Sequence, residues 1–539
     1  MLLPRPLTAL VDAFPRHLLP YVYILCLIPA LVSFYKDSKK QKHLTDNVPG
    51  CRKLGLKDKS NLADGHSTKS NKSDASSPCR IKALFIHPIK SCASVELDIA
   101  DLSSTGFRWD RQFCFAHWAI PTHFPPDFPD QAKRKHCWVF CSLRTPGYEK
   151  LVKVRPEVWV PDKDYEALTG KRNPNPNGVL VIRYPNVPRG TLLVRLALRL
   201  GQFLRLVPAE TSFRVPLSPT LDHGYQLEEV SIWKDITQAL NYGQHVPQDF
   251  RSYLGLPSTR LFTLFRASPS HYRNVLRNAP RHSTRGEDGT VPYQPSIAFS
   301  DSYPIHLLNW ASLQDVGAKV GATTSVPTGK PSSLPEQPGS EFKREATSES
   351  TAMQNANISK SPTLSHLTAR RFRPNIVVTG PPPYDEDDWK KITITTTPSQ
   401  NQKAAASSSS SATFYCACRT IRCRLPNVDP DTGFRHPSEP DNTLRSFRCV
   451  DEGDPLKAAL GLQIVAADDM GEGRGEAREA EAEAEAGDKG QENVRGDEVV
   501  REVQDGDQTL GKMDFRKPQL KVGDEIEVLE RGKHVYIKR

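Results

Sequence analysis

Short stretches of alternating apolar and polar residues dominate the chain from about Ile81 to Pro208. Such runs occur at residues 81–88, 95–99, 107–117, 151–160, 179–184 and 192–207, with connections rich in proline and glycine. Alternation with a period of two is typical of half-buried strands, whereas the 3.6-residue period of helices is scarce here. The pattern therefore predicts a β-rich barrel or sandwich over this region.

The second half of the chain mixes strands with a few helices. Strands are predicted at residues 230–233 and 261–265, and a short helix at 249–254. Asn309 is a typical N-cap for a helix running roughly over residues 310–316. The folded pattern resumes at residues 371–379, 389–395, 414–424 and 521–529. The predicted fold class is β-rich α+β.

Three polar stretches interrupt this pattern. Residues 318–365 are rich in Ser, Thr, Pro and Gly, residues 396–412 include a serine run, and residues 466–508 contain alternating Glu and Ala. Their polar composition predicts that all three are disordered, and the alternating Glu and Ala of the third has no apolar face. Because loop-closure entropy grows slowly with length, such inserts are expected to extend from the surface without disturbing the core.

The N-terminal part has the pattern of a membrane anchor. Residues 18–35 carry no charged side chain, and their length lies near the short end of the roughly 17–25 residues that span a bilayer. Four lysines between residues 36 and 42 outnumber the two arginines before residue 18. The positive-inside rule then places the C-terminal bulk in the cytosol. A cleaved secretory signal is the alternative, but no small-x-small cleavage site follows the apolar run.

These patterns predict a leader at residues 1–17, a transmembrane anchor at 18–35 and a disordered tether at 36–79. The total of 539 residues is enough for two or more domains. The net charge of +10 is spread along the chain, so nucleic-acid binding is not favoured. The eleven cysteines are odd in number and irregularly spaced, which indicates a reducing compartment rather than a disulfide framework.

Cys423 is the leading candidate for chemistry. It lies among Arg419, Arg422 and Arg424, and a turn signal follows at residues 429–433. Neighbouring cations favour the thiolate, which is both the nucleophilic and the metal-binding form of cysteine. The alternative is a half-buried structural thiol. A zinc site built from Cys416, Cys418 and Cys423 has unusual spacing and lacks a compact partner pair, and no phosphate-binding loop or nucleophile elbow is present.

Cationic groups at three other places suit a phosphate-bearing ligand. Lys90 and Ser91 follow a predicted strand, Arg111 follows Trp-Asp, and arginines including Arg373 precede the strand after Asn375. Lysine offers a point charge to phosphate and arginine a planar fork. Each pattern alone is also typical of surface ion pairs. Asp301, which precedes the helix capped by Asn309, is either a proton donor near a site or a local turn former.

The order of these segments resembles that of MOSC-domain proteins, which are named for the C-terminal domain of molybdenum cofactor sulfurase. The motifs that carry the resemblance lie at residues 86–92, 106–111, 371–378, 386–389, 422–423 and 428–433. The arrangement is most similar to the type of the mitochondrial amidoxime reducing component. The resemblance implies an N-terminal MOSC β-barrel domain at residues 80–208 and a MOSC β-barrel domain at residues 226–530.

The resemblance also implies a molybdenum cofactor, in which a pterin dithiolene with a phosphate tail holds the metal. By motif, Cys423 becomes the metal ligand and a catalytic residue, and Asp301 a candidate acid near the metal. The implied cofactor-binding residues are Lys90, Ser91, Arg111, Asn309, Arg373 and Asn375. Where the family usually has Ser, this chain has Asn309, so a hydroxyl contact there is lost although the cap is retained. Pyridoxal phosphate is not expected within this chain.

The implied function is a membrane-anchored molybdenum oxidoreductase that reduces N-hydroxylated compounds such as amidoximes and hydroxylamines. Electrons would come from a haem b cytochrome and its flavin reductase, and the mitochondrial outer membrane or the endoplasmic reticulum would receive the anchor. One alternative is a sulfur carrier that uses a Cys423 persulfide in cofactor sulfuration and depends on a separate desulfurase. Another is a non-enzymatic, membrane-tethered scaffold.

Overall fold

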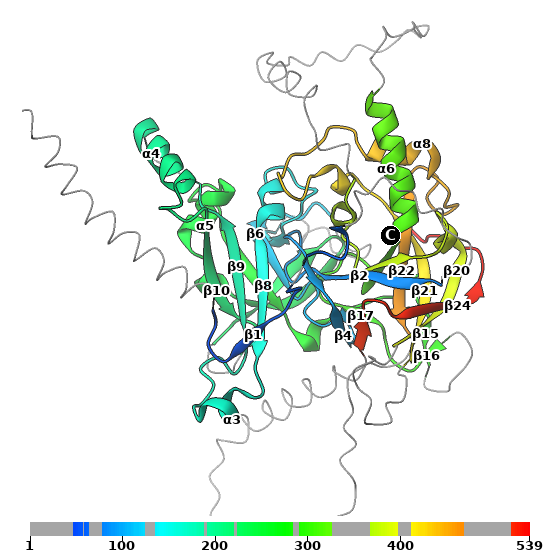
Figure 1. Cartoon of the computed structure of the whole chain (residues 1–539), viewed down its shortest axis with the longest axis horizontal. Helices are drawn as coiled ribbons and strands as arrows, with labels where there is room; N and C mark the ends of the chain where they lie inside the picture. The colour runs from blue at the N-terminus through cyan, green and yellow to red at the C-terminus, as the bar shows by residue number, and fades with distance from the viewer. Residues whose placement is uncertain are drawn as a thin grey trace, which may run out of the picture. The chain divides into compact units, whose positions relative to one another are not determined.

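The computed structural model describes residues 47–57, 59–63, 78–123, 135–187, 191–219, 224–283, 290–325, 367–396, 411–467 and 519–538. The predicted leader and anchor lie outside these residues, as do most of the predicted tether and inserts. The described part of the predicted disordered tether differs from that prediction, because Cys51–Lys53 form a strand that pairs with residues 159–161 and Val48 is buried. In the part of the chain that is described, no helix has the length and apolar character needed to cross a membrane. The described residues form two compact units (Figure 1).

The first unit contains residues 47–53, 157–219 and 247–253. Its four-stranded sheet has the order β1 (Cys51–Lys53), β8 (Arg155–Pro161), β9 (Val179–Pro185) and β10 (Glu210–Pro216). The short helices α3 (Tyr165–Thr169) and α5 (Gln248–Leu254) belong to the same region. The ring of Phe250 on α5 lies 4.9 Å from Tyr184 and 5.3 Å from Phe213, so an aromatic cluster packs α5 against β9 and β10.

One segment of this unit differs from its predicted structure. Residues 192–207 were predicted as a strand, but the structure has helix α4 (Leu192–Phe203) followed by a turn. Leucines at positions 192, 196 and 200 are followed by Phe203, which is a helical spacing. Leucine, alanine and arginine are also strong helix formers. The strand prediction was therefore wrong because this helical period was overlooked among many apolar residues.

The second unit contains a closed five-stranded barrel. Val230 on β11 pairs with Trp138 on β7 in a parallel ladder that closes it. Its core is formed by small and large apolar side chains such as Cys114, Ala116 and Phe265. The strands, in barrel order, are β11 (Leu227–Ile232), β12 (Asp235–Asn241), β13 (Phe262–Ala267), β6 (Phe113–Ala119) and β7 (Cys137–Phe140).

The second unit also contains a second barrel. Its sheet starts at strand β19 and ends at strand β2, and it closes because β2 pairs with β19 as well as with its neighbour β24. Strand β3 (Val95–Leu97) extends the sheet beside the end of β2. The barrel strands in order are β19 (Ile376–Thr379), β18 (Ile305–Asn309), β22 (Ala459–Ala466), β21 (Ser411–Ile421), β20 (Trp389–Thr395), β24 (Glu525–Arg531) and β2 (Arg80–Ile86). The prediction of a β-rich α+β protein with two barrels is confirmed.

Each barrel takes strands from both sides of the predicted domain boundary at residues 208–226. Strand β2 comes from the N-terminal segment and completes the second barrel, while β11, β12 and β13 come from the C-terminal segment and complete the first. The small sheet of β4 (Ile99–Ser103), β5 (Gly106–Phe107) and β23 (Gln519–Lys521) likewise joins distant segments. Residues that follow β2 are therefore positioned by strands of the C-terminal segment.

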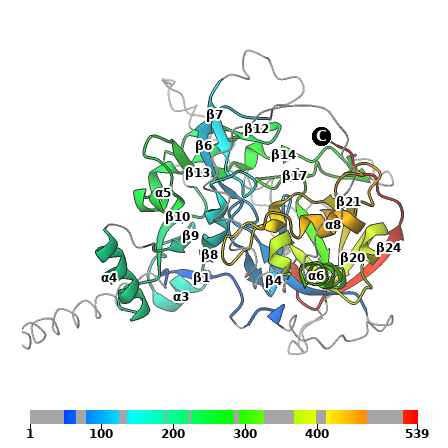
Figure 2. The same ribbon diagram turned by 90° about the horizontal axis from the view of Figure 1, so that it is seen from above.

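Two helices pack beside the second barrel, as Figure 2 shows from above. They are α6 (Trp310–Ser325) and α8 (Asp441–Phe447). Helix α6 extends past residue 318, where an insert was predicted to begin. The buried side chains of Leu313, Val316 and Val320 recur at helical spacing and contribute to the core, which explains the longer helix.

Candidate functional site

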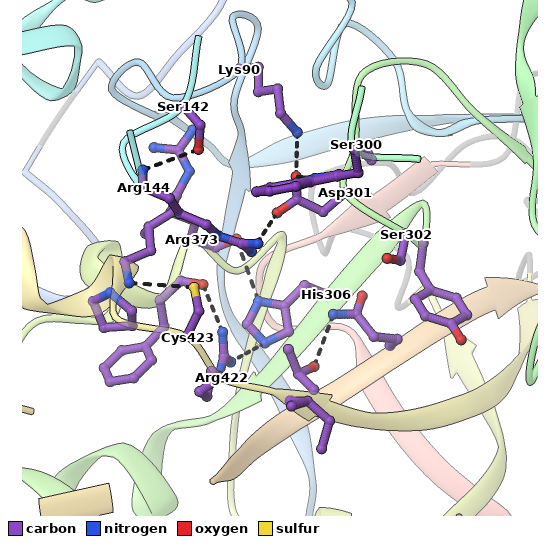
Figure 3. Close-up of a pocket in the computed structure, with 18 of the residues that line it drawn as sticks. Lys90, Ser142, Arg144, Ser300, Asp301, Ser302, His306, Arg373, Arg422 and Cys423 are labelled. Atoms are coloured by element: carbon purple, nitrogen blue, oxygen red, sulfur yellow. Dashed lines mark hydrogen bonds and ion pairs between the residues drawn. The ribbon is translucent and has the colours of Figure 1, made fainter. Parts of the chain in front are cut away.

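A cavity of about 370 Å³ lies in the second unit, lined by strand ends and loops from distant parts of the sequence (Figure 3). Of the eight residues predicted for a site, seven line this cavity and Asn309 does not. The seven are Lys90, Ser91, Arg111, Asp301, Arg373, Asn375 and Cys423. The structure thus brings together segments that lie up to more than 300 positions apart along the chain.

Lys90 enters the cavity from the loop that follows β2. Its backbone N–H donates to Phe113 O at 2.8 Å, which fixes the loop against β6. Its ammonium donates to Phe299 O at 2.8 Å and to the carboxylate of Asp301. Burial lowers the pKa of Lys90 to about 8, although the charge of Asp301 opposes this shift. The cavity therefore holds an oriented ammonium whose proton is easier to lose than that of an ordinary lysine.

Asp301 is held between cations. Besides the Lys90 ammonium, it accepts hydrogen bonds from Arg144 Nη2 at 3.1 Å and from Trp233 Nε1 at 3.1 Å. Burial alone would raise the pKa of Asp301, but the charges of Lys90 and Arg144 hold it well below its usual range. In this arrangement Asp301 is ionised at neutral pH and has no proton to give. These contacts orient Lys90 and Arg144, and the role of Asp301 as an acid near a metal stays a prediction.

A second group of cations lies at the start of β19. Arg111 Nη1 donates to Asn375 Oδ1 at 3.1 Å, and its Nη2 donates to Arg373 O at 3.3 Å. Arg373 Nη1 donates to Cys92 O at 2.6 Å, whereas its buried Nη2 has no hydrogen-bond partner among the described residues. Burial, together with the charge of Arg111, lowers the pKa of Arg373 to about 10. An unsatisfied guanidinium N–H in a cavity is a ready site for an anion.

The backbone around the cavity is held in conformations that side chains rarely adopt. Among the described residues, eight non-glycine residues have a positive φ, and four of these line this cavity. They are Ser91 (φ 70°), Arg111 (49°), Trp233 (56°) and Arg373 (54°). Such residues cost conformational energy and cluster at functional sites, where the surrounding structure imposes the geometry. Their concentration here indicates that this cavity is the functional centre.

Cys423 lies at the end of β21, just before the short 3-10 helix η11 (Leu425–Asn427). Its half-buried sulfur lines the cavity and accepts a hydrogen bond from the Leu425 N–H at 3.4 Å. Arg144, which the sequence did not indicate, lies beside this sulfur. Burial lowers the pKa of Arg144, but Asp301 and Cys423 raise it by more, so the guanidinium stays charged next to the thiol.

Arg422 and His306 fix the strand end that carries Cys423. Arg422 Nε donates to Leu460 O at 2.9 Å, and its Nη2 contacts His306 Nε2 at 2.6 Å (Figure 3). Because a guanidinium only donates, His306 Nε2 must accept, so the ring is neutral and carries its proton on Nδ1. Burial and the charge of Arg422 accordingly place the pKa of His306 well below its usual range.

Asn309 has a structural role at the start of α6. Its Oδ1 accepts the N–H of Ala311 at 3.0 Å, which is an N-cap contact. Its Nδ2 donates to Pro382 O at 2.8 Å and to Glu386 at 3.0 Å, so both ends of the buried amide are satisfied. The predicted cap is confirmed, but a contact between Asn309 and a ligand in the cavity has no geometric support.

The fold and this cavity define a two-barrel protein with a cationic, thiol-containing ligand site. Residues 78–119 match the family model of the MOSC N-terminal beta barrel domain, and residues 346–455 match that of the MOSC domain. These two stretches of the chain are therefore similar to domains of the MOSC family, which are associated with molybdenum cofactor binding or metabolism. A search of curated proteins found no match.

The residues of the cavity fit a molybdenum cofactor. Cys423 offers a soft sulfur donor of the kind that such metals accept. The unpartnered Arg373 Nη2, with Arg111 and Lys90, offers positive charge to a phosphate. Among residues 47–538 that are described, no group of three or more His, Cys, Asp or Glu side chains could hold a metal ion by itself, so the zinc alternative gains no support.

Proposed function

We propose that this protein is a molybdenum-cofactor oxidoreductase that reduces N-hydroxylated compounds such as amidoximes and hydroxylamines. The observation that carries the proposal is the shared cavity of Cys423 and the unsatisfied Arg373 guanidinium. The cavity offers both a sulfur ligand and a buried cation. A cofactor that combines a thiophilic metal with an anionic tail needs both.

Each group of the cavity then has a role. Cys423 would hold the metal, while Arg111 and Arg373 would bind the anionic tail, and the bound cofactor would supply the two-electron chemistry. Asp301 orients Lys90 and Arg144. Lys90, with its pKa lowered to about 8, is suited to give and regain a proton near neutral pH.

The membrane and the electron donors belong to the same proposal. The uncharged residues 18–35, followed by lysines, support a single membrane anchor with the C-terminal bulk in the cytosol. The similarity to the amidoxime reducing component type supports a haem b cytochrome and a flavin reductase as the source of electrons. It also supports the mitochondrial outer membrane as the location, with the endoplasmic reticulum as the alternative.

Elemental analysis and pterin fluorescence of the purified protein test this function. The native protein is expected to contain stoichiometric molybdenum and pterin and to reduce benzamidoxime when a reductant is supplied. Cys423→Ser is expected to lose this activity. Cys449→Ser is the matched control, because Cys449 is also a half-buried free thiol of this unit but does not line the cavity. Equal activity in Cys423→Ser and Cys449→Ser would refute the proposal.

One observation favours a second candidate function. The Leu425 N–H at 3.4 Å and the charged Arg144 would also stabilise a persulfide anion on Cys423. In that case the protein would carry sulfur for cofactor sulfuration. Cyanide-labile sulfur that depends on Cys423, in protein without molybdenum, would identify this function. A tethered scaffold would instead show neither molybdenum nor labile sulfur.

A further inference from the structure

Helix α4 of the first unit exposes an unusual amount of apolar surface. Leu192 is 74% exposed, Leu196 64% and Phe203 83%, and no residue of the helix is buried. Figures 1 and 2 show α4 at the margin of this unit, beyond its four-stranded sheet. A contiguous exposed apolar surface of this kind marks a site that contacts another protein or a membrane.

The orientation of α4 is the reverse of that of an ordinary surface helix. The side that faces its own unit carries the half-buried Leu198, Gly201 and Gln202, and Gln202 Nε2 donates to Asn186 O at 2.7 Å. On the same side, Gly201 O accepts the N–H of Leu206 at 2.7 Å, and a Cβ at position 201 would lie 2.9 Å from Val207. The opposite side carries Leu192, Leu193, Leu196, Leu200 and Phe203, which form one continuous stripe at helical spacing.

The charges around this stripe are all positive. Arg195 and Arg199 lie along one edge of it and Arg205 follows the helix, while residues 191–209 contain no acidic side chain. At 1.5 Å per residue the helix is about 18 Å long, shorter than the roughly 30 Å of a bilayer core, so it can lie along a membrane but not span it.

We propose that α4 is an interfacial helix that binds the surface of an anionic phospholipid bilayer. The leucines and Phe203 would enter the acyl boundary, and Arg195 and Arg199 would pair with phosphate and carboxylate headgroups. A second copy of the same face would bring arginines against arginines, which argues against a symmetric dimer here. The proposal rests on the first unit alone and depends neither on the molybdenum chemistry nor on the N-terminal anchor.

Hydrogen exchange of the full chain, read by mass spectrometry, tests the proposal locally. Vesicles of phosphatidylcholine with phosphatidylserine are expected to slow the amides of residues 192–204, and vesicles of phosphatidylcholine alone to do so less. Leu196→Gln with Phe203→Gln is expected to weaken this protection by roughly tenfold in lipid concentration. Arg195→Gln or Arg199→Gln is expected to cost about fivefold each, with the anionic vesicles only.

Leu168→Gln is the matched control, because Leu168 is an 80% exposed leucine of the same unit outside α4, and it should leave protection unchanged. Three results would overturn the proposal. The amides could already be slow without lipid, which would mean that another part of the chain covers the stripe. Protection could rise with protein concentration alone, which would mean self-association. Protection by anionic vesicles could persist in the Leu196→Gln, Phe203→Gln protein.

Discussion

Arg371 Nη2 donates to Asp429 Oδ2 at 2.6 Å, and both side chains are buried. Arg371 Nη1 also donates to Pro426 O at 3.1 Å. The other carboxylate oxygen of Asp429 accepts the N–H of Thr432 at 2.7 Å. These contacts tie the short 3-10 helix η9 (Ala369–Phe372) to the loop after Cys423, so the arginine-rich motif and the Val-Asp-Pro-Asp-Thr-Gly motif form one support for the thiol.

Replacing Arg371 by Met should weaken this support. The carboxylate of Asp429 would stay buried without its cation, and the loss of one partner of a buried pair costs about 3–5 kcal/mol of unfolding free energy. Denaturant unfolding measures this loss. Arg370→Met is the control, because the exposed Arg370 pairs with Asp431 at the surface and should cost less than about 1 kcal/mol. Equal losses in both proteins would contradict the structural role of Arg371.

Asp301→Asn should shift the pH dependence of the activity. The carboxylate of Asp301 opposes the effect of burial on Lys90, so its removal should bring the pKa of Lys90 below about 8. A step that needs the Lys90 ammonium should then fail at a lower pH than in the native protein. The alkaline limb of the rate profile measures this shift. Asp301→Glu keeps the charge, so its rate should fall at the same alkaline pH as in the native protein. If the rate of Asp301→Asn also falls at the native pH, Lys90 does not transfer the proton.

The sequence predicted which segments share the cavity better than it predicted their contacts. Lys90, Arg111, Arg373 and Cys423 belong to ordered motifs, and the structure brings all four to one cavity. Their roles toward a cofactor remain predictions. His306 was missed because its partner Arg422 lies 116 positions away and only strand pairing brings the two together. No local pattern distinguishes such a histidine from one in the core.

Other differences have local causes. Arg144 and Trp233 follow no motif, and their place beside Asp301 depends on the turn between β11 and β12 and on the loop after β7. Asn309 follows a strand and begins a helix, as predicted, but its amide is used up by Glu386 and by the helix N-terminus. The sequence therefore predicted that Asn309 caps the helix. It could not show that the side chain of Asn309 has no hydrogen-bonding group left for a ligand.

Arg373→Lys should weaken the retention of the cofactor while the fold persists. Lysine keeps the positive charge but has a single nitrogen in place of the guanidinium fork, so it cannot occupy the positions of both Nη1 and Nη2. A lost charge-assisted hydrogen bond costs roughly tenfold in affinity. The pterin that remains after extended dialysis measures the effect. Arg370→Lys is the control, since Arg370 lies outside the cavity lining. If both proteins retain pterin equally, Arg373 does not bind the anionic tail.

Gly461→Ala should disturb the support behind Cys423. Gly461 has φ +78°, and a Cβ there would lie 2.5 Å from Leu307 O and 2.8 Å from His306 Nε2. Strain and overpacking together should cost about 2–4 kcal/mol of unfolding free energy. Gly321→Ala, in open space on α6, should instead be neutral or stabilise by up to about 1 kcal/mol. Thermal unfolding of the two variants measures the contrast, and a neutral Gly461→Ala would show that β22 can shift away from His306.

Glu386 should make the stability of the second unit depend on pH. Its buried carboxyl accepts hydrogen bonds from Asn309 and Ser312, yet burial raises its pKa from 4.5 to about 7. The folded protein therefore binds a proton more tightly than the unfolded chain. This contribution to stability is present below about pH 4.5 and is lost as the pH rises toward 7.

Glu386→Gln removes this ionisation and leaves a neutral side chain that still accepts from Ser312. Relative to the native protein, the variant should gain up to about 3 kcal/mol of unfolding free energy between pH 5 and pH 8, since one pKa unit corresponds to about 1.4 kcal/mol. Denaturant unfolding at pH 5, 6.5 and 8 measures the difference. Asp388→Asn is the control, because it removes an exposed carboxyl of the same short helix η10 (Asp385–Asp388). It should not reproduce the pH-dependent difference that the buried Glu386 causes. The difference in unfolding free energy between the native protein and Glu386→Gln could instead stay constant with pH. Glu386 would then have the same pKa in the folded and the unfolded protein, because the hydrogen-bond donors Asn309 and Ser312 fully offset the effect of its burial.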